Sequence, residues 1–427
     1  MATEILSSTK KFRGTPVIPG DKSVSHRSLI FGALASGETE VTHLLNSADV
    51  NSTASCLRQL GVEILKIGDD KVLVKGCSGF RFKEPSEVLD CGNSGTTMRL
   101  LMGVLAGQDL KATLTGDASL NKRPMKRVSE PLSLMGGHFE LTGGNFAPLT
   151  IKGKPLHGIN YDLKIASAQI KTAIMLAALN AQGTTTITGE IHSRDHTERM
   201  LNHFGVRVTS DDHQVVVEGG QSLKGNSIRV PGDPSTAAFW LGAASLIPDS
   251  LVKMENISLN PSRTGFAEAL KRMGGVVTSK MVIHDPEPMG TMQARGSRLV
   301  GVHIRAEDVP ALIDEIPLLA VLATQAHGAT IVEGAEELRV KESDRLEAVA
   351  QNLRAMGATI EVRKDGFAIS GPQKLKGAVI ESFHDHRIAM AFSIAALVAS
   401  GETEIRDSGC VAISYPDFFK TLKSLSR

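Results

Sequence analysis

The sequence predicts an α/β protein of two domains, each made of three repeated βαβαββ units whose helices lie inside and whose sheets lie outside. Three observations predict this inside-out arrangement. A helix of small apolar residues, followed by a glycine turn, a β-rich stretch and a second helix, recurs six times. The repeated helices are apolar on most faces, as buried helices are, whereas the strands alternate apolar and polar residues. A Pro-Gly-Asp sequence occurs twice and marks the domain boundaries.

The repeat can be followed along the whole chain. Its first copy predicts helices at 25–34 and 54–60 and strands at 39–41 and 62–65. The later copies place their apolar helices at 97–106, 168–179, 237–246, 316–323 and 388–398, with a last helix at 418–425. Turn glycines recur at Gly37, Gly107, Gly183, Gly328 and Gly401, and one copy lacks such a glycine. A period of roughly 65–80 residues is too long for a solenoid repeat and fits a compact βαβαββ subdomain.

The two Pro-Gly-Asp turns, at 19–21 and 231–233, divide the chain. We expect residues 21–232 to form one domain, and residues 1–20 with 233–427 to form the other, because 427 residues exceed what one core usually supports. Ligands commonly bind between domains, so the sequence predicts an active site in the cleft between the two.

Composition excludes several classes of protein. Lys and Arg number 47 and Asp and Glu number 46, which gives a net charge of +1, and aromatic residues make up only 4%. A nucleic-acid partner is therefore not expected. The N-terminal residues do not have the pattern of a secretory signal, and no long apolar run predicts a membrane span. The four cysteines form no CxxC pair and are expected to be reduced thiols, so we predict a cytoplasmic protein.

Cations gather at short loops that are each expected to open a helix. The segments are Lys22-Ser23 with Arg27, Lys122-Arg123, Ser167 to Lys171, Lys341-Glu342 with Arg345, and Asp385-His386-Arg387. A helix N-terminus carries free N–H groups and positive dipole charge, so cations placed there predict a strongly anionic ligand. Lys341 and Arg345 are expected one turn apart on the same helix face, where an anion between them would relieve their repulsion.

Other segments add groups of different chemistry. The Gly-rich run at 90–97 is expected to present backbone N–H groups to an oxyanion. Asp314 and Glu315 precede an apolar helix and are candidate carboxylates, although simple acids at a helix start are an equally good interpretation. Walker A, GxGxxG, GxSxG and HExxH patterns are all absent. The sequence therefore predicts no metal and no cofactor.

Taken together, these segments resemble the 5-enolpyruvylshikimate-3-phosphate synthase family over almost the whole chain. The motifs that carry the resemblance are GDKSVSHR at 20–27, GNSGTTMR at 92–99, KRPM at 122–125, SAQIK at 167–171, RDHTE at 194–198, LIDEIP at 312–317, RVKESDR at 339–345 and DHRIAM at 385–390. The resemblance implies the enolpyruvyl transferase fold, with two inside-out domains of three repeats each. It also implies transfer of the enolpyruvyl group of phosphoenolpyruvate to the 5-hydroxyl of shikimate 3-phosphate, with release of phosphate, by a monomer.

The same motifs imply residue roles. Lys22, Asp314 and Glu342 are the expected catalytic residues, with Asp314 as base for the attacking hydroxyl. Shikimate 3-phosphate is expected to contact Lys22, Ser23, Arg27, Ser167, Ala168, Gln169, Arg194, Asp314 and Lys341. Phosphoenolpyruvate is expected to contact Lys22, Asn93, Gly95, Arg123, Gln169, Arg345 and Arg387.

Departures from the family pattern concern the inhibitor glyphosate. RDHTE and SAQIK resemble the class II branch, which often tolerates it, and Ile413 stands where another branch has a lysine that contacts phosphoenolpyruvate. Gly95 stands where the tolerant members have alanine, and Ser262 where they have threonine. We expect partial tolerance.

Three alternatives remain open at this point. A sister enzyme that transfers enolpyruvate to UDP-N-acetylglucosamine shares the fold, but its usual loop cysteine is missing from residues 117–124. An RNA 3′-phosphate cyclase is built from related repeats, yet the near-neutral charge disfavours it. A catalytically inactive anion-binding protein would not need both Asp314 and Glu342.

Overall fold

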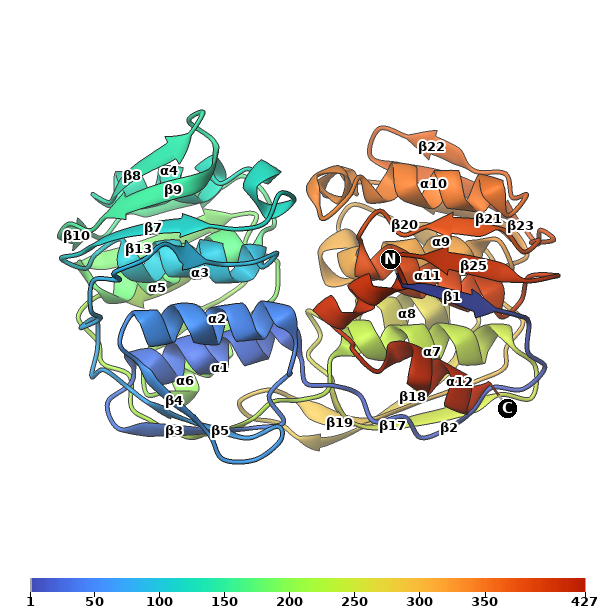
Figure 1. The fold of residues 1–427 in the computed structure, drawn as a ribbon, viewed down its shortest axis with the longest axis horizontal. Coiled ribbons are helices and arrows are strands. Elements are labelled where there is room, and N and C mark those ends of the chain that lie inside the picture. Colours follow the sequence, from blue (N-terminus) through green and yellow to red (C-terminus); the bar gives the residue numbers. More distant parts are fainter. Residues whose placement is uncertain (1, 427) are drawn as a thin grey trace. The chain divides into compact units, whose positions relative to one another are not determined.

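The computed structural model describes residues 2–426, which divide into two compact units with separate hydrophobic cores (Figure 1). The central unit comprises residues 20–231 together with residues 285–287. The terminal unit comprises residues 2–19, 232–284 and 288–426.

The central unit contains six α-helices, and most of its strands belong to three sheets. The helices are α1 (Lys22–Leu34), α2 (Ala48–Gln59), α3 (Gly95–Leu105), α4 (Lys126–Leu134), α5 (Ala168–Leu179) and α6 (His196–His203). The strands are β3 (Glu38–Thr42), β4 (Glu63–Lys66), β5 (Val72–Lys75), β6 (Leu89–Asp90), β7 (Lys111–Thr115), β8 (His138–Thr142), β9 (Phe146–Lys152), β10 (Leu156–His157), β11 (Asn160–Leu163), β12 (Ala181–Gln182), β13 (Thr184–Gly189), β14 (Val208–Ser210), β15 (Val215–Glu218) and β16 (Ser227–Arg229).

The three main sheets of the central unit share one topology. Their strand orders are β16-β3-β5-β4, β6-β7-β9-β8 and β11-β13-β15-β14. In each sheet the first pair is parallel and the next two pairs are antiparallel. A short parallel pair, β10-β12, adds a fourth, smaller sheet.

The terminal unit repeats this topology with one variation. Its helices are α7 (Pro234–Leu246), α8 (Gly265–Arg272), α9 (Ile316–Ala323), α10 (Arg345–Ala355), α11 (His386–Ala396) and α12 (Phe418–Leu425). Its strands are β1 (Thr3–Leu6), β2 (Arg13–Gly14), β17 (Leu251–Ser258), β18 (Val276–Ile283), β19 (Met289–Arg295), β20 (His303–Ile304), β21 (Gly328–Val332), β22 (Glu361–Arg363), β23 (Gly366–Gly371), β24 (Val379–Glu381) and β25 (Thr403–Arg406). The sheet orders are β18-β19-β17-β2, β20-β21-β23-β22 and β1-β25-β24, so the last repeat has three strands and ends on the N-terminal strand.

The first helix of each repeat is buried on nearly every face, and the second is amphipathic. In α5 every residue from Ile170 to Leu179 is buried, whereas α6 buries only its first turn and one apolar side. Small residues allow the buried helices to approach each other closely. A Cβ at Gly103 in α3 would lie 2.2 Å from the carbonyl oxygen of Ala173 in α5. Helices inside and sheets outside are therefore the arrangement that the sequence predicted (Figure 1).

The predicted elements agree well with the observed ones, and one group of turn residues shows why. Four of the predicted turn glycines have positive φ, namely Gly37, Gly183, Gly328 and Gly401, a conformation that favours glycine. Asp249 has a φ of 55° in the copy without a glycine. Gly107 also lies in a turn, but its φ is not positive.

Two predicted helix starts are wrong. Lys122 ends a 3-10 turn (Leu120–Lys122), and α4 begins only at Lys126, after the rigid Pro124. Lys341 follows another 3-10 turn (Glu336–Val340), and α10 begins at Arg345 because Asp344 caps it by accepting from the Glu347 N–H. Lys341 and Arg345 therefore do not share a helix face.

Each chain crossing between the units is fixed by backbone hydrogen bonds. In the central unit the Asp21 N–H donates to Pro231 O at 2.7 Å, and in the terminal unit the Asp233 N–H donates to Pro19 O at 2.9 Å. A third excursion, residues 285–287, carries the turn between β18 and β19 into the central unit. Nothing in the sequence pattern predicted this segment.

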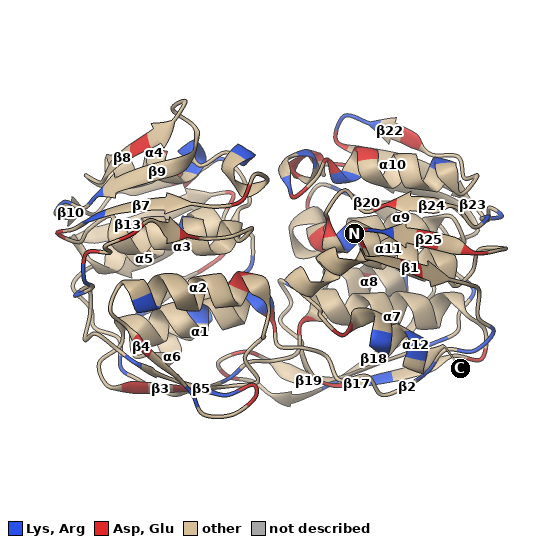
Figure 2. Cartoon of the chain, in the orientation of Figure 1, with Lys and Arg blue, Asp and Glu red and all other residues tan. Residues whose placement is uncertain are grey.

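Charged residues of both signs occur in both units. Lys and Arg residues, like Asp and Glu residues, are scattered over helices, strands and loops of each unit (Figure 2). Among residues 2–426, the helices are all too short or too polar to cross a membrane.

Candidate active site

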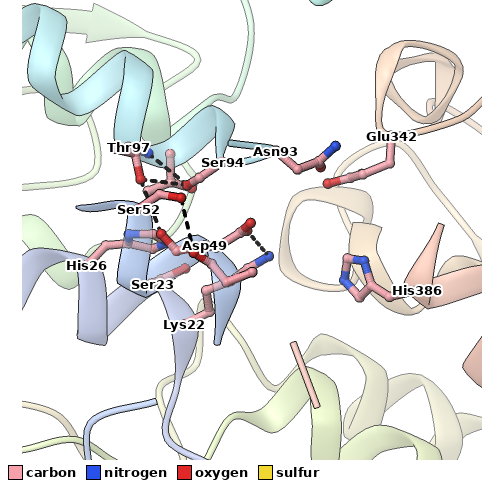
Figure 3. A network of polar contacts seen from close by, with 12 residues as sticks. Lys22, Ser23, His26, Asp49, Ser52, Asn93, Ser94, Thr97, Glu342 and His386 are labelled. Carbon is pink, nitrogen blue, oxygen red and sulfur yellow. Dashed lines mark hydrogen bonds and ion pairs between the residues drawn. The ribbon is translucent and has the colours of Figure 1, made fainter. Parts of the chain in front are cut away.

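The first turn of α1 carries the first group of predicted site residues. Asp21 caps the helix by accepting from the Val24 N–H at 2.8 Å, which fixes the direction in which the next two side chains leave the backbone. Lys22 Nζ contacts Asp49 Oδ2 at 3.0 Å (Figure 3). Ser23 Oγ accepts from Arg194 Nη1 at 3.3 Å. The cationic side chains of Lys22 and Arg194 are thus both held by protein partners, and 19% of the Lys22 side chain remains exposed.

Arg27 lies beneath this turn and is only 2% exposed. Its Nε and Nη2 donate to Thr197 Oγ1 and Thr172 Oγ1, both at 2.8 Å, and its Nη1 donates to Ser23 O at 3.0 Å. Burial lowers the pKa of this guanidinium to about 10, against the opposing effect of the Glu198 and Asp21 carboxylates.

A chain of short hydroxyl contacts connects α1 to the Gly-rich loop (Figure 3). His26 Nδ1 lies 2.7 Å from Thr53 Oγ1, which lies 2.6 Å from Thr97 Oγ1. Thr97 in turn donates from N and Oγ1 to Ser94 Oγ, at 3.1 and 2.7 Å. Burial, then the charges of Lys22 and Arg27, hold the pKa of His26 well below its ordinary value, so the ring is neutral.

The Gly-rich loop also holds Arg123. The Asn93 side-chain oxygen accepts from Arg123 Nη2 at 2.7 Å, and the Asn93 carbonyl accepts from Nη1 at 3.3 Å. Gly95 lies against the same guanidinium, because a Cβ there would be 3.5 Å from Arg123 Nη1 and 3.3 Å from Arg99 Nη1. The absence of a side chain at Gly95 therefore leaves space beside two guanidinium groups.

The start of α5 presents the neutral groups of the SAQIK motif. Ser167 caps the helix, and Ala168 is its first residue. Gln169 accepts from Arg99 Nη1 and donates to Thr96 Oγ1 at 2.9 Å, so its amide orientation is fixed on both sides. Lys171 differs from the prediction, because it is 2% exposed and pairs with Glu198 Oε1 at 2.7 Å. It is a structural cation of the core, not one that faces a ligand.

In the terminal unit, one buried guanidinium gathers three carboxylates. Arg345, 1% exposed, donates from Nη2 to Glu342 Oε2 at 2.8 Å and from Nη1 to Asp314 Oδ1 at 3.3 Å. Its Nε and Nη2 donate to the two oxygens of Asp385 at 2.8 and 3.2 Å. Burial alone would lower the pKa of Arg345, but the carboxylates of Asp385, Glu342 and Asp314 outweigh it and raise the pKa.

Around this guanidinium, burial changes two further groups. Glu315 is 2% exposed, and desolvation followed by repulsion from Asp314 raises its pKa, against the attraction of Arg387. The pKa of the Lys341 ammonium is lowered by desolvation, an effect that the Asp314 carboxylate opposes. Lys341 therefore belongs to the same electrostatic neighbourhood as Asp314 and Glu342, although it reaches it from a loop.

Arg387 lies at the start of α11. Its backbone N–H donates to Asp385 Oδ1 at 2.9 Å, so the carboxylate that orients Arg345 also caps the helix that carries Arg387. Ser343 Oγ donates a fourth hydrogen bond to the Asp385 carboxylate, at 3.0 Å.

The structure therefore brings the predicted residues together in two groups. Lys22, Ser23, Arg27, Asn93, Gly95, Arg123, Ser167, Ala168, Gln169 and Arg194 belong to the central unit, and Asp314, Lys341, Glu342, Arg345 and Arg387 to the terminal unit. Sequence reasoning missed Asp49, Arg99 and the role of Asp385, each of which orients a predicted residue. Arg99 and Asp385 lie within the quoted motifs at 92–99 and 385–390 but were given no role there, and Asp49 lies in none of the motifs. Among residues 2–426, His, Cys, Asp and Glu side chains form no group that could hold a metal ion.

The two groups differ in chemistry. The central group offers cations, neutral amides and hydroxyls, which suit phosphate and carboxylate oxygens. The terminal group offers Asp314 and Glu342, whose side chains are 18% and 17% exposed and which share one guanidinium. Carboxylates held in this way can accept and return protons at fixed positions.

Comparison with known proteins identifies the family. The model of the family described as EPSP synthase (3-phosphoshikimate 1-carboxyvinyltransferase) matches residues 6–422. The chain is 47% identical over 419 residues to the 3-phosphoshikimate 1-carboxyvinyltransferase of Bacillus cytotoxicus, covering 97% of this chain and 98% of that one. Identity to the enzyme of the same name from Herpetosiphon aurantiacus is 49% over 422 residues, with 98% of each chain covered.

Solved structures agree. EPSP synthase from Acinetobacter baumannii has a TM-score of 0.88 at 43% identity, covering 99% of this chain and 98% of that one. The enolpyruvyl transferase NikO from Streptomyces tendae, 17% identical, has a TM-score of 0.79 over 99% and 96% of the two chains, a likeness of fold alone. The predicted enolpyruvyl transferase fold is thus confirmed, and the chain belongs to the EPSP synthase family, the 3-phosphoshikimate 1-carboxyvinyltransferases.

Proposed function

We propose that this transferase moves the enolpyruvyl group of phosphoenolpyruvate to the 5-hydroxyl of shikimate 3-phosphate through a tetrahedral intermediate. The observation that carries the mechanism is the contact of Arg345 with both Glu342 and Asp314. The reaction needs two groups that exchange protons with the substrates, and these carboxylates are ionisable, partly exposed and held in fixed positions.

The proposed steps balance as an addition followed by an elimination. Asp314 takes the proton of the 5-hydroxyl while the hydroxyl oxygen bonds to C2 of phosphoenolpyruvate. In the same addition, Glu342 or Lys22 gives a proton to C3. The intermediate carries both phosphate and the new C–O bond on C2. Loss of the C3 proton to the same group then restores the double bond and expels phosphate.

For shikimate 3-phosphate we propose contacts with Lys22, Ser23, Arg27, Ser167, Ala168, Gln169, Arg194, Asp314 and Lys341. The 3.3 Å contact between Arg194 and Ser23 supports a shared role at the phosphate, and the cap at Ser167 orients the start of α5. Arg27 has protein partners on all three of its nitrogens, so its main contribution is to fix the turn that carries Ser23 and Lys22.

For phosphoenolpyruvate we propose contacts with Lys22, Asn93, Gly95, Arg123, Gln169, Arg345 and Arg387. The open space at Gly95, between two guanidinium groups, suits an anionic group of small size. Positioning two bound anions in this way supplies up to about 7–11 kcal/mol of the barrier reduction.

The first test of this function is phosphate release. The enzyme is incubated with phosphoenolpyruvate and either shikimate 3-phosphate or UDP-N-acetylglucosamine, and free phosphate is measured. Release with shikimate 3-phosphate alone supports the proposal. Release only with the nucleotide sugar, or with neither acceptor, contradicts it.

Glyphosate tolerance is tested at Gly95. A methyl group there would lie within 3.5 Å of two guanidinium nitrogens, where it narrows the space for an inhibitor longer than phosphoenolpyruvate. We predict that Gly95→Ala raises the inhibition constant for glyphosate by about tenfold or more, since a clash of about 1.4 kcal/mol is a factor of ten. Inhibition constants of wild type and Gly95→Ala are compared, and equal constants would contradict this role of Gly95.

We further infer a monomeric, cytoplasmic enzyme. Each unit has its own hydrophobic core, and the four cysteines are free thiols, as in reducing compartments. Sedimentation velocity measures the mass directly.

A further inference from the structure

One buried acidic residue outside the family motifs contacts the region that carries Arg194. Glu287 lies in the turn between β18 and β19, within residues 285–287 of the central unit, and is 2% exposed. Its Oε1 lies 2.7 Å from Nδ1 of His196, which is itself 0% exposed. A histidine N–H that faces a carboxylate at this distance makes a charge-assisted hydrogen bond.

His196 is the first residue of α6, and its neighbours are held as firmly as it is. Thr197 Oγ1 lies 2.8 Å from Arg27 Nε and 2.6 Å from Thr172 Oγ1. Glu198 Oε1 pairs with Lys171 at 2.7 Å. Three consecutive buried side chains thus attach the start of α6 to α1, to α5 and to Glu287.

Arg194 lies two residues before His196 and reaches Ser23 Oγ at 3.3 Å. The position of its backbone depends on how the start of α6 is attached. Glu287 also acts electrostatically on this region, because its charge counts among those that oppose the lowered pKa of Arg27.

A purely stabilising role does not account for a polar pair at this place. A polar pair buried in a core seldom adds stability over apolar residues of the same volume, whereas its hydrogen bond holds the two side chains in a defined direction. The turn also belongs to a hairpin whose two strands lie in the other unit. The Glu287 carboxylate thus contacts α6 from a turn that is 91 residues away from His196 in sequence.

We propose that Glu287 is a positioning residue of the shikimate 3-phosphate site, acting through His196 on the segment that carries Arg194. The inference rests on the proposed function, because it assigns Arg194 to that substrate. The residue touches neither substrate, so its loss affects binding of shikimate 3-phosphate and not the chemical step.

The test measures the Kd of shikimate 3-phosphate by isothermal titration calorimetry and the steady-state constants of the full chain. Glu287→Ala is expected to raise this Kd by about tenfold, as the loss of about 1.4 kcal/mol would do. Its kcat at saturating substrate is expected to stay within about twofold of wild type, because uniform binding is what is lost. Glu287→Gln keeps an oxygen that accepts from Nδ1 and is expected to restore most of the affinity.

Asp285→Asn is the matched control. It removes one negative charge from the same turn at an exposed position, and it is expected to leave the Kd unchanged. Equal weakening by Asp285→Asn and Glu287→Ala would overturn the inference, as would a folded Glu287→Ala variant with wild-type Kd. If Glu287→Ala does not fold, Glu287→Asp replaces it, because its shorter side chain withdraws the carboxylate, and a wild-type Kd there also overturns the inference.

The wild-type titration separates this inference from the proposed function. If the wild type does not bind shikimate 3-phosphate, the proposed function fails. If the wild type binds it and the Glu287 variants bind it equally well, only the role of Glu287 fails.

Discussion

At the scale of single residues, the charged side chains of the candidate site are oriented by protein partners before any substrate arrives. Asp49 holds Lys22, Asn93 holds Arg123, and Asp385 holds Arg345 through two of its nitrogens. A side chain that is already fixed loses little conformational entropy on binding a ligand. Asp49 and Asp385 are not themselves predicted ligands, whereas Asn93 is also an expected contact of phosphoenolpyruvate.

Glu342→Gln tests the proton-transfer role. The variant keeps its shape and an oxygen for Arg345 but can no longer exchange a proton, so we predict a loss of turnover of about 10²–10⁴-fold. Calorimetry with shikimate 3-phosphate is expected to give a Kd close to that of the wild type. The control Glu336→Gln lies in the same segment, is exposed, and is expected to be silent in both assays. Near-normal turnover of Glu342→Gln removes Glu342 from the mechanism.

The neutral state of His26 predicts a pH dependence of stability. Its pKa in the folded protein lies well below 6.5, so only the unfolded chain takes up this proton as the pH falls below 6.5. The free energy of unfolding therefore does not depend on the protonation of His26 above pH 6.5. It falls as the pH drops from 6.5 toward the lower folded pKa, by at most about 1.4 kcal/mol per pH unit.

Urea denaturation from pH 7.5 to pH 5.5 measures this slope. We predict that His26→Asn makes the free energy of unfolding less dependent on pH in this range. His213→Asn, at an exposed position, is the control and is expected to keep the wild-type slope. Identical slopes for all three proteins would show that His26 is not held neutral.

At the scale of elements, capped helix starts place the site residues. Asp21, Ser94, Ser167, Asp344 and Asp385 each accept a backbone N–H from the first turn of their own helix. The cap satisfies a free N–H group and fixes the angle at which the preceding loop enters the helix. In four of the five cases a predicted site residue lies directly after the cap.

Ser94→Ala tests the importance of a cap. Removing the hydroxyl that accepts from Thr97 N is expected to lower the free energy of unfolding by about 1 kcal/mol and to raise the KM for phosphoenolpyruvate, since Asn93 and Gly95 flank it. Ser47→Ala is the matched control, because Ser47 precedes α2 without a side-chain cap bond. A larger effect of Ser47→Ala than of Ser94→Ala in urea denaturation would refute the assignment.

At the scale of the whole molecule, each of the two units has its own hydrophobic core, and both are built on the same repeated topology. Their buried residues form two clusters with no member in common. Five of the six main sheets in residues 2–426 have four strands with the same pairing, and the sixth uses the N-terminal strand as its edge. A defect in one core is therefore expected to remain in its own unit.

Two reciprocal variants test this independence. Phe31 belongs to the core of the central unit and Phe392 to that of the terminal unit, both at 0% exposure. Either change to alanine is expected to cost about 3–5 kcal/mol. Hydrogen exchange is predicted to accelerate in residues 20–231 for Phe31→Ala and in residues 288–426 for Phe392→Ala. Acceleration of both regions by each variant would mean that the two cores unfold as one.

Sequence alone determined the repeated fold and most helix positions, and it predicted the members of the candidate site. Small apolar runs predict buried helices because periodicity and composition are local properties, and 168–179, 316–323 and 418–425 are observed as predicted. Motif chemistry likewise made Lys22, Arg123 and Glu342 candidate site residues, since residue type is visible without coordinates.

Only the tertiary structure decided which charge faces which. Lys171 carries the same charge as Lys22, but burial beside Glu198 makes it a core cation. Lys341 and Arg345 look like neighbours on one helix, and the cap at Asp344 separates them. Asp49 and Glu287 gave no sequence signal, because each meets its partner only after segments distant in sequence have packed. Pair contacts depend on this packing, so local pattern predicts the elements of this protein and tertiary packing decides the partners of its charges.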